Sequence, residues 1–187
     1  MKKESNFRYV LRITFTLLAI AIVVASALAI ANQLTAPAIA QSLEKKTQEA
    51  IELVLPGGGT EITGFDSQNG MVTKVYQGQN GYAVQVEPIG FDGPITMMVG
   101  VGNDSKIQGI SIISHTESAG LGAVAADKGP KGQAFRDQLI GQSGSVAVSK
   151  DDGTIDSITG ATITSRAVCD GVNAALKCVA TLQGGAA

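Results

Sequence analysis

The sequence predicts an α+β fold, in which an N-terminal transmembrane helix precedes an antiparallel sheet packed with two or three helices. Three observations predict it. The chain has no charged residue between Arg12 and Glu44. Residues 72–114 form short β-rich runs that are separated by turn signals. Residues 164–182 repeat apolar side chains at three- and four-residue spacing, as an amphipathic helix does.

The apolar run from Ile13 to Ala31 predicts a retained membrane anchor. As a helix it would span roughly 28 Å, close to the hydrocarbon thickness of a bilayer. The alternative is a cleaved signal peptide, because Ala25-Ser26-Ala27 resembles a small-residue cleavage site. Under either interpretation the basic start of the chain stays in the cytoplasm. We therefore expect residues 1–35 to form a cytoplasmic tip and anchor, and residues 36–187 to form an extracytoplasmic domain.

The junction Thr35-Ala36-Pro37 predicts a break in the helix and a restart, because proline is tolerated in a first turn. A second helix is expected over residues 38–55, ended by Pro56-Gly57-Gly58-Gly59. Four strands should follow, with connections so short that neighbouring strands must be antiparallel. The predicted strands are Val72–Tyr76, Tyr82–Val86, Ile95–Val101 and Ile107–Ser114.

The last third of the chain predicts one more hairpin between two helices. A short helix is expected over residues 134–139. Val146–Val148 and Thr154–Ile158 are predicted to pair as a hairpin around an Asp-Asp-Gly turn. The final helix is expected to run from Thr164 to Leu182.

Charge and cysteine content exclude several classes of function. The chain carries 14 basic and 16 acidic side chains, and four of the basic ones lie in the first twelve residues, so the remainder is acidic. An acidic domain lacks the electrostatic footprint of a nucleic-acid binder. Cys169 and Cys178 lie nine residues apart in one predicted helix, on opposite faces, which excludes a disulfide and indicates buried structural thiols. With one histidine and no CxxC, no metal site is expected.

The hydroxyl-rich stretch from Asp156 to Ser165 lies between a predicted strand and the final helix. Threonine and serine at this place are ordinary helix caps. A helix N-terminus also offers free N–H groups and a partial positive charge, which suit a phosphate. The residues alone leave both interpretations open.

The spacing Asp156-x-x-Thr159-Gly160-Ala161-Thr162 resembles the flavinylation motif of the FMN-binding domain family. The resemblance implies that FMN is esterified through its phosphate to Thr162, and that a separate flavin transferase makes the bond from FAD outside the cytoplasmic membrane. It also implies a flavin-binding role for the rest of the motif, with Asp156 a recognition element for the transferase. Thr164 and Ser165 are candidate phosphate contacts and Arg166 a candidate phosphate partner, or all three merely start the helix.

A second segment, His115 to Gly122, resembles the His-x-Glu-Thr-Pro-Gly-Leu-Gly segment that lines the flavin site in the same family. It departs from that pattern at Ser118 and at Ala119, where a rigid proline is lost. The resemblance implies flavin-site roles for Glu117, Ser118, Gly120, Leu121 and Gly122. From the residues alone, Glu117 could equally be a solvated loop carboxylate and His115 a surface residue at a strand end.

Nearly the whole chain resembles the G subunits of Rnf complexes, the ion-translocating ferredoxin:NAD oxidoreductases of bacterial membranes. The basic anchor, Leu34-Thr35-Ala36-Pro37 and Val54-Leu55-Pro56 carry this resemblance. It implies a one-electron carrier in the cell membrane that passes electrons between partner subunits, is no enzyme on its own and has no catalytic residue. The alternatives are a stand-alone extracytoplasmic FMN carrier, the C subunit of the Na+-translocating NADH:quinone reductase, or an anchored binding or scaffold module.

Overall fold

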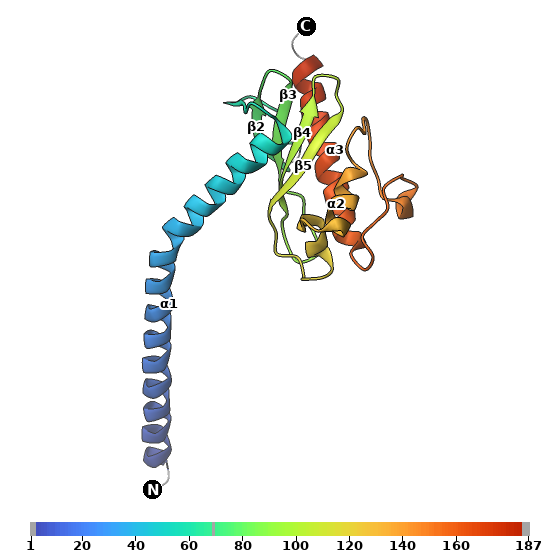
Figure 1. Cartoon of the computed structure of the whole chain (residues 1–187). Helices are drawn as coiled ribbons and strands as arrows, with labels where there is room; N and C mark the ends of the chain where they lie inside the picture. Colours follow the sequence, from blue (N-terminus) through green and yellow to red (C-terminus); the bar gives the residue numbers. More distant parts are fainter. Residues whose placement is uncertain (1–2, 69, 185–187) are drawn as a thin grey trace. The chain divides into compact units, whose positions relative to one another are not determined.

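The computed structural model describes residues 3–68 and 70–184 of the chain (Figure 1). It divides into two units, Met1–Glu44 and Lys45–Ala187. Residues 1–2, at the start of the expected cytoplasmic tip, and residues 185–187, at the end of the expected extracytoplasmic domain, lie outside the described residues. Lys2, one of the basic residues of that tip, is therefore not described.

A single helix, α1, spans Lys3–Val54 and contains Pro37 in its interior. The predicted break at residues 35–37 is therefore wrong, and residues 38–54 continue α1 instead of starting a second helix. Proline removes only one backbone hydrogen bond, and the turns on either side of it can carry the helix through. Thr35 bonds within the helix, since its Oγ1 donates to the carbonyl oxygen of Ala31 at 2.9 Å.

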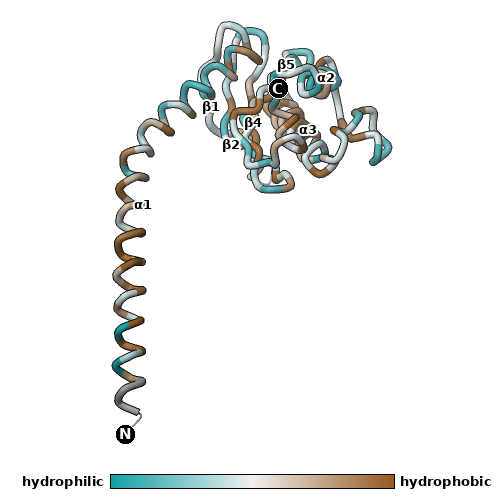
Figure 2. Tube along the Cα trace, turned by 60° about the horizontal axis from the view of Figure 1, so that its bottom comes forward, coloured by the Kyte–Doolittle hydropathy of each residue, from teal (hydrophilic) through white to brown (hydrophobic). Residues whose placement is uncertain are grey.

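The part of α1 in the first unit has the surface of a membrane span. Residues 7–54 lie on a helix long and apolar enough to cross a bilayer. Figure 2 shows a continuous hydrophobic stretch along α1 with hydrophilic residues at its ends. The hydroxyls of Thr14 and Thr16 donate to the carbonyl oxygens of Val10 and Arg12, at 3.0 and 2.8 Å, so neither needs water.

The second unit contains a five-stranded antiparallel sheet in the order β1-β2-β3-β4-β5. The strands are β1 (Thr60–Ile62), β2 (Val72–Gln77), β3 (Gly81–Val86), β4 (Thr96–Gly102) and β5 (Ile107–Ser114). The four predicted strands and their antiparallel order are confirmed. Strand β1 was not predicted, because three residues next to a glycine-rich turn show no alternating pattern.

One face of the sheet packs against the C-terminal helix, α3, which spans Thr162–Gly184 (Figure 1). Val75, Val84, Val99 and Ile110 are paired across β2 to β5 and form a continuous apolar row on this face. Gly171 brings α3 close to the sheet, since a Cβ there would lie 2.4 Å from Cε of Met97. This face holds the larger part of the core.

The opposite face of the sheet is covered by the end of α1. Ala50, Ile51, Val54 and Leu55 are buried against a cluster formed by Tyr76, Ala83, Met98 and Ile113. The inner strand β4 is therefore buried on both faces, which explains its nearly continuous run of apolar and glycine residues.

Two glycines that pair across β4 and β5 lie against Val54 at the end of α1 and allow a test of the packing there. A Cβ on Gly100 would lie 2.4 Å from the carbonyl oxygen of Val54, whereas a Cβ on Gly109 would lie 3.5 Å from Cγ1 of Val54. We expect Gly100→Ala to lower the free energy of unfolding by about 1–3 kcal/mol. Gly109→Ala, the matched control, should change it by less than about 1 kcal/mol. Equal effects of the two variants in thermal unfolding would contradict this packing.

The C-terminal elements differ from the prediction in two places. The short helix α2 spans Pro130–Asp137, earlier than expected, because Pro130 starts it at the first turn. The predicted hairpin of Val146–Val148 with Thr154–Ile158 is wrong. Val148 and Ile155 instead form an isolated parallel bridge, and the 3₁₀ helix η2 (Ser149–Asp151) lies between them.

Cys169 and Cys178 are free and buried on α3, as predicted. Burial raises the pKa of each thiol to about 11. Both therefore remain protonated at neutral pH and act as small apolar core residues.

Candidate functional site

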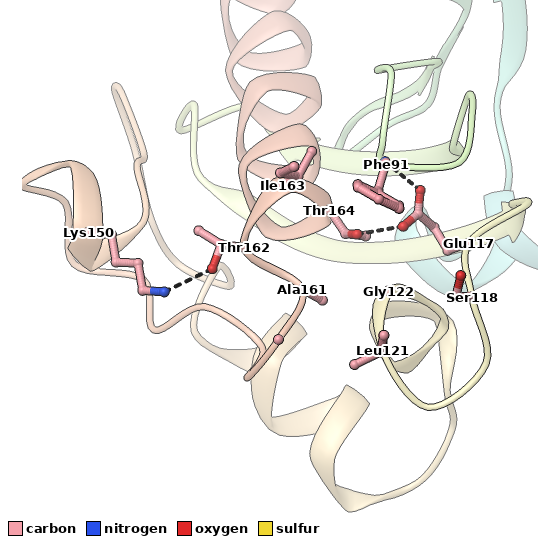
Figure 3. Close-up of a pocket in the computed structure, with 11 residues that line it drawn as sticks. Phe91, Glu117, Ser118, Leu121, Gly122, Lys150, Ala161, Thr162, Ile163 and Thr164 are labelled. Atoms are coloured by element: carbon pink, nitrogen blue, oxygen red, sulfur yellow. Dashed lines mark hydrogen bonds between the residues drawn. The ribbon is translucent and has the colours of Figure 1, made fainter.

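A pocket of about 360 Å³ opens at the N-terminus of α3 (Figure 3). We call it the α3 pocket. Four parts of the chain line it: the segment from Glu117 to Gly122, the segment from Gly160 to Thr164, the loop before β4 and η2. Its lining residues are Phe91, Glu117, Ser118, Leu121, Gly122, Lys150, Gly160, Ala161, Thr162, Ile163 and Thr164.

Thr162 is the first residue of α3, and its half-buried side chain lines the α3 pocket. Its Oγ1 accepts a hydrogen bond of 3.0 Å from Nζ of Lys150. Gly160, at φ +79°, makes the turn that leads into the helix. The first N–H groups of a helix have no partner within it, so Thr162 lies where backbone donors are free for an anion.

Glu117 is buried and accepts three hydrogen bonds from two other parts of the fold. Its Oε2 accepts from Oγ1 of Thr164 at 2.5 Å. Its Oε1 accepts from the backbone N–H groups of Phe91 and Asp92, at 2.8 and 3.2 Å. Figure 3 shows this carboxylate between the start of α3 and the Phe91 loop. The solvated loop carboxylate that the sequence left open is excluded.

The residues on either side of Glu117 strengthen the same contact. Oγ1 of Thr116 donates to the carbonyl oxygen of Asp92 at 3.2 Å, and Oγ of Ser118 donates to the side-chain carboxylate of Asp92 at 2.6 Å. Three consecutive side chains of the loop after β5 thus bind the turn before β4. The wall of the α3 pocket is fixed by side-chain hydrogen bonds.

Two glycines make room for the Glu117 carboxylate. A Cβ on Gly122 would lie 2.1 Å from Oε2 of Glu117, and a Cβ on Gly90 would lie 2.2 Å from Oε1. Gly120 differs from both, since it is exposed and adopts φ +76° with open space around it. Gly122 therefore serves close packing, and Gly120 serves the turn.

Four of the predicted flavin-site residues do not line the α3 pocket. Ser165 is fully buried, donates to the carbonyl oxygen of Ala161 and accepts from the N–H of Ile158, both at 3.0 Å. It secures the helix start. Asp156, Thr159 and Gly120 line a neighbouring pocket against α2. The motif therefore faces two sides, with Gly160 to Thr162 toward the α3 pocket and Asp156 to Thr159 toward α2.

Arg166, a candidate phosphate partner in the sequence analysis, is engaged elsewhere. Its Nε and one terminal nitrogen each lie 2.6 Å from a carboxylate oxygen of Asp151. The hydrogen bond from Arg166 holds the pKa of Asp151 below its ordinary value, and the same bond raises the pKa of Arg166. The pair fastens η2 to the first turn of α3.

The pair predicts a pH dependence. A carboxyl group whose pKa is lower in the folded state contributes stability above its unfolded pKa, and this contribution is lost as the pH falls through the lowered value. Asp151→Asn should therefore melt slightly below the wild type at neutral pH. The two melting curves should converge in acid, well below the ordinary pKa of 3.8. A gap of constant size down to the acid limit would contradict a role for the Asp151 charge.

Three pocket residues were missed by the sequence analysis, namely Phe91, Lys150 and Ile163. Phe91 and Ile163 are 67 and 49% exposed, and Leu121 is 48% exposed, so the pocket has an apolar rim. Phe91 stands in a turn and Lys150 in a charged loop, where no local pattern marks either residue. Ile163 alone of the three adjoins the motif. It is an apolar residue between two threonines at a helix start, and this pattern could have marked it as a pocket residue.

Comparison with known proteins decides the family. The family model of the FMN-binding domain matches residues 90–177. The G subunit of the proton-translocating ferredoxin:NAD(+) oxidoreductase complex of Clostridium ljungdahlii is 31% identical over 99% of this chain and 100% of its own. The chain belongs to the family of G subunits of ion-translocating oxidoreductase complexes.

Other members support the assignment over the full length. The G subunit of the Na(+)-translocating ferredoxin:NAD(+) oxidoreductase complex of Acetobacterium woodii is 30% identical over 94% of each chain. The G subunit of the ion-translocating oxidoreductase complex of Methanosarcina acetivorans is 28% identical over 96% of this chain. The predicted family and α+β fold are confirmed. This member of the G-subunit family has an FMN-binding domain, and its N-terminal helix α1 is long and apolar enough to span a membrane.

Proposed function

We propose that this chain carries FMN esterified to Thr162 and relays electrons within an ion-translocating electron transport complex of the cell membrane. The observation that carries the proposal is the position of Thr162. Its hydroxyl lies at the first turn of α3, lines a pocket of the FMN-binding domain and contacts a lysine. The other hydroxyls of the motif are buried and bonded, or lie outside this pocket.

The α3 pocket fits a phosphorylated flavin at both of its ends. The polar end, with Thr162, Lys150 and the helix N-terminus, suits a phosphate. The apolar end, with Phe91, Leu121 and Ile163, suits an aromatic ring system. A volume of about 360 Å³ lies within the usual range of small-molecule sites.

Attachment at Thr162 exchanges one phosphorus–oxygen bond for another. Oγ1 of Thr162 bonds to the FMN phosphorus of FAD, the phosphoanhydride bond breaks, AMP leaves and the hydroxyl proton passes to the transferase or to solvent. A threonine hydroxyl is a poor nucleophile, so a flavin transferase must supply most of the activation. The phosphodiester product keeps one negative charge, which the N-terminus of α3 stabilises. Retention of the cofactor then no longer depends on its binding affinity.

When bound, FMN supplies the reversible electron uptake, and the protein supplies orientation and shielding. The related subunits are named as parts of complexes that translocate protons or sodium ions. In this chain we assign ion movement to the partner subunits, because α1 has no ionisable residue between Arg12 and Glu44. The basic start of α1 supports a position of the FMN-binding domain outside the cytoplasm.

The test starts from the full chain produced together with a flavin transferase. The denatured chain should fluoresce in a gel under ultraviolet light. Trypsin cleaves after Lys150 and Arg166, so fragment 151–166 should carry the flavin, and fragmentation in a mass spectrometer should place it on Thr162. A dark band, or a flavin on another residue of this fragment, would overturn the proposal.

A further inference from the structure

We propose that Lys150 is the counter-ion of the phosphate on Thr162, which makes η2 part of the flavin site. The inference rests on the proposed function and adds a residue outside the flavinylation motif. Its starting point is the 3.0 Å hydrogen bond from Nζ of Lys150 to Oγ1 of Thr162, across twelve residues of chain. Figure 3 shows the lysine reaching toward this hydroxyl from the side opposite Glu117.

The charges around the α3 pocket leave this role to Lys150. Among the described residues that line the pocket, Lys150 alone is basic. Arg166 has its guanidinium on Asp151, and the acidic Glu117 is occupied by Thr164 and by backbone N–H groups. In the described part of the chain no carboxylate lies within 4 Å of Nζ of Lys150. An ammonium group has three donors, so two remain for phosphate oxygens next to Oγ1.

The loop that carries Lys150 is held in place from within. The N–H groups of Asp151 and Gly153 donate to the carbonyl oxygen of Val148, at 2.8 and 3.1 Å. The N–H of Ser149 donates to the carbonyl oxygen of Ile155 at 2.8 Å. Gly153 packs so closely on Ala147 that a Cβ would lie 2.0 Å from the Ala147 carbonyl oxygen. Lys150 is therefore presented by a fixed turn.

Two consecutive residues of this loop bond two residues on one face at the start of α3. Thr162 and Arg166 are four positions apart and so lie on one face of the helix. Lys150 bonds the first, and the next residue, Asp151, bonds the second. The Asp151–Arg166 pair thus positions Lys150, and the lysine side chain is ready before any phosphate is attached.

The experiment compares Lys150→Gln, which removes the charge, with Lys150→Arg, which keeps it. Full chains are incubated with flavin transferase and FAD, and flavin attachment is followed by gel fluorescence. Lys150→Gln should lower the initial rate at least about tenfold, and Lys150→Arg should remain within about threefold of wild type. Raising the salt from about 0.05 M to about 0.5 M should slow the wild type and leave Lys150→Gln unchanged. Lys177→Gln, which changes an exposed lysine of α3 that does not line the α3 pocket, is the matched control.

A second readout separates contact with the phosphate from contact with the transferase. After prolonged incubation, loaded and unloaded chains are melted. Loading should raise the Tm of the wild type and of Lys150→Arg more than that of Lys150→Gln. A complete failure of Lys150→Gln to load, with rescue by Lys150→Arg, also supports the proposal.

Three results would overturn the proposal. The first is flavin attachment to Lys150→Gln at the wild-type rate. This result would remove the role of Lys150 but not the proposed function, in which Thr162 carries the flavin. The second is a slow rate with a full Tm gain, which would assign Lys150 to the transferase contact. The third is a wild type that takes up no flavin, which would remove the proposed function as well.

Discussion

Thr162→Ala should abolish covalent flavin completely while the fold remains intact. The substitution removes the single oxygen to which the phosphorus would bond, and the next two hydroxyls of α3 are already engaged. Oγ1 of Thr164 is bound to Glu117, and Oγ of Ser165 is bound to the Ala161 carbonyl oxygen. The measurement is the flavin fluorescence of the denatured chain, with the Tm as a check on folding. Because Thr162 is only half-buried, we expect a loss of less than about 1 kcal/mol in stability.

Two controls surround this result. Thr162→Ser keeps a hydroxyl at the same backbone position and should still accept flavin. Thr181→Ala removes a threonine from the other end of α3, where its hydroxyl only bonds the carbonyl oxygen of Lys177, and should fluoresce as the wild type does. A fluorescent Thr162→Ala band would move the attachment to another residue.

Glu117→Ala should produce the largest loss of stability among single substitutions in the site. It leaves the Thr164 hydroxyl and the N–H groups of Phe91 and Asp92 without their acceptor. Unsatisfied donors of this kind are costly, and we expect about 3 kcal/mol in total. For a chain of this size such a loss lowers the Tm by roughly 6–12 °C. Calorimetry of the full chain in detergent measures it directly.

Glu117→Ala should also weaken flavin loading, because the wall formed by the Phe91 loop loses its link to α3. Glu117→Gln keeps one carbonyl acceptor and should fall between the wild type and Glu117→Ala. Glu61→Gln, an exposed glutamate of β1, is the matched control and should leave both Tm and loading unchanged. A wild-type Tm for Glu117→Ala would show that its hydrogen bonds do not hold the pocket together.

The part of the site that could be predicted is the part that is local in sequence. The motif from Asp156 to Thr162 and the segment from Glu117 to Gly122 are short, and their resemblance to the FMN-binding domain family marked them as site residues. Their glycines and hydroxyls alone indicated only turns and a helix start. The four main strands were predictable because alternation and turn residues act over a few positions. The hydrogen bonds of Glu117 join residues 25, 26 and 47 positions apart, and no local pattern encodes them.

The errors in the prediction have a common physical origin. Pro37 favours a break locally, but hydrogen-bonded turns on both sides carry α1 through it. The Asp-Asp-Gly turn after Lys150 suggested a hairpin, but the parallel bridge between Val148 and Ile155 requires the chain to loop around through η2. In both cases interactions beyond the turn itself outweighed a local preference.

The sequence by itself determined a long apolar N-terminal segment, the antiparallel sheet and the final helix, which follow from periodicity and from residue types with strong local preferences. The motif that ends in Thr162 was marked by its resemblance to the FMN-binding domain family. Only the tertiary structure decided which hydroxyl of the motif faces the α3 pocket, that Glu117 is a buried acceptor, and that Lys150 rather than Arg166 lies at Thr162. The physical reason is that hydrogen bonds and charge pairs between distant segments depend on how sheet, loops and helix pack, which adjacent residues do not specify.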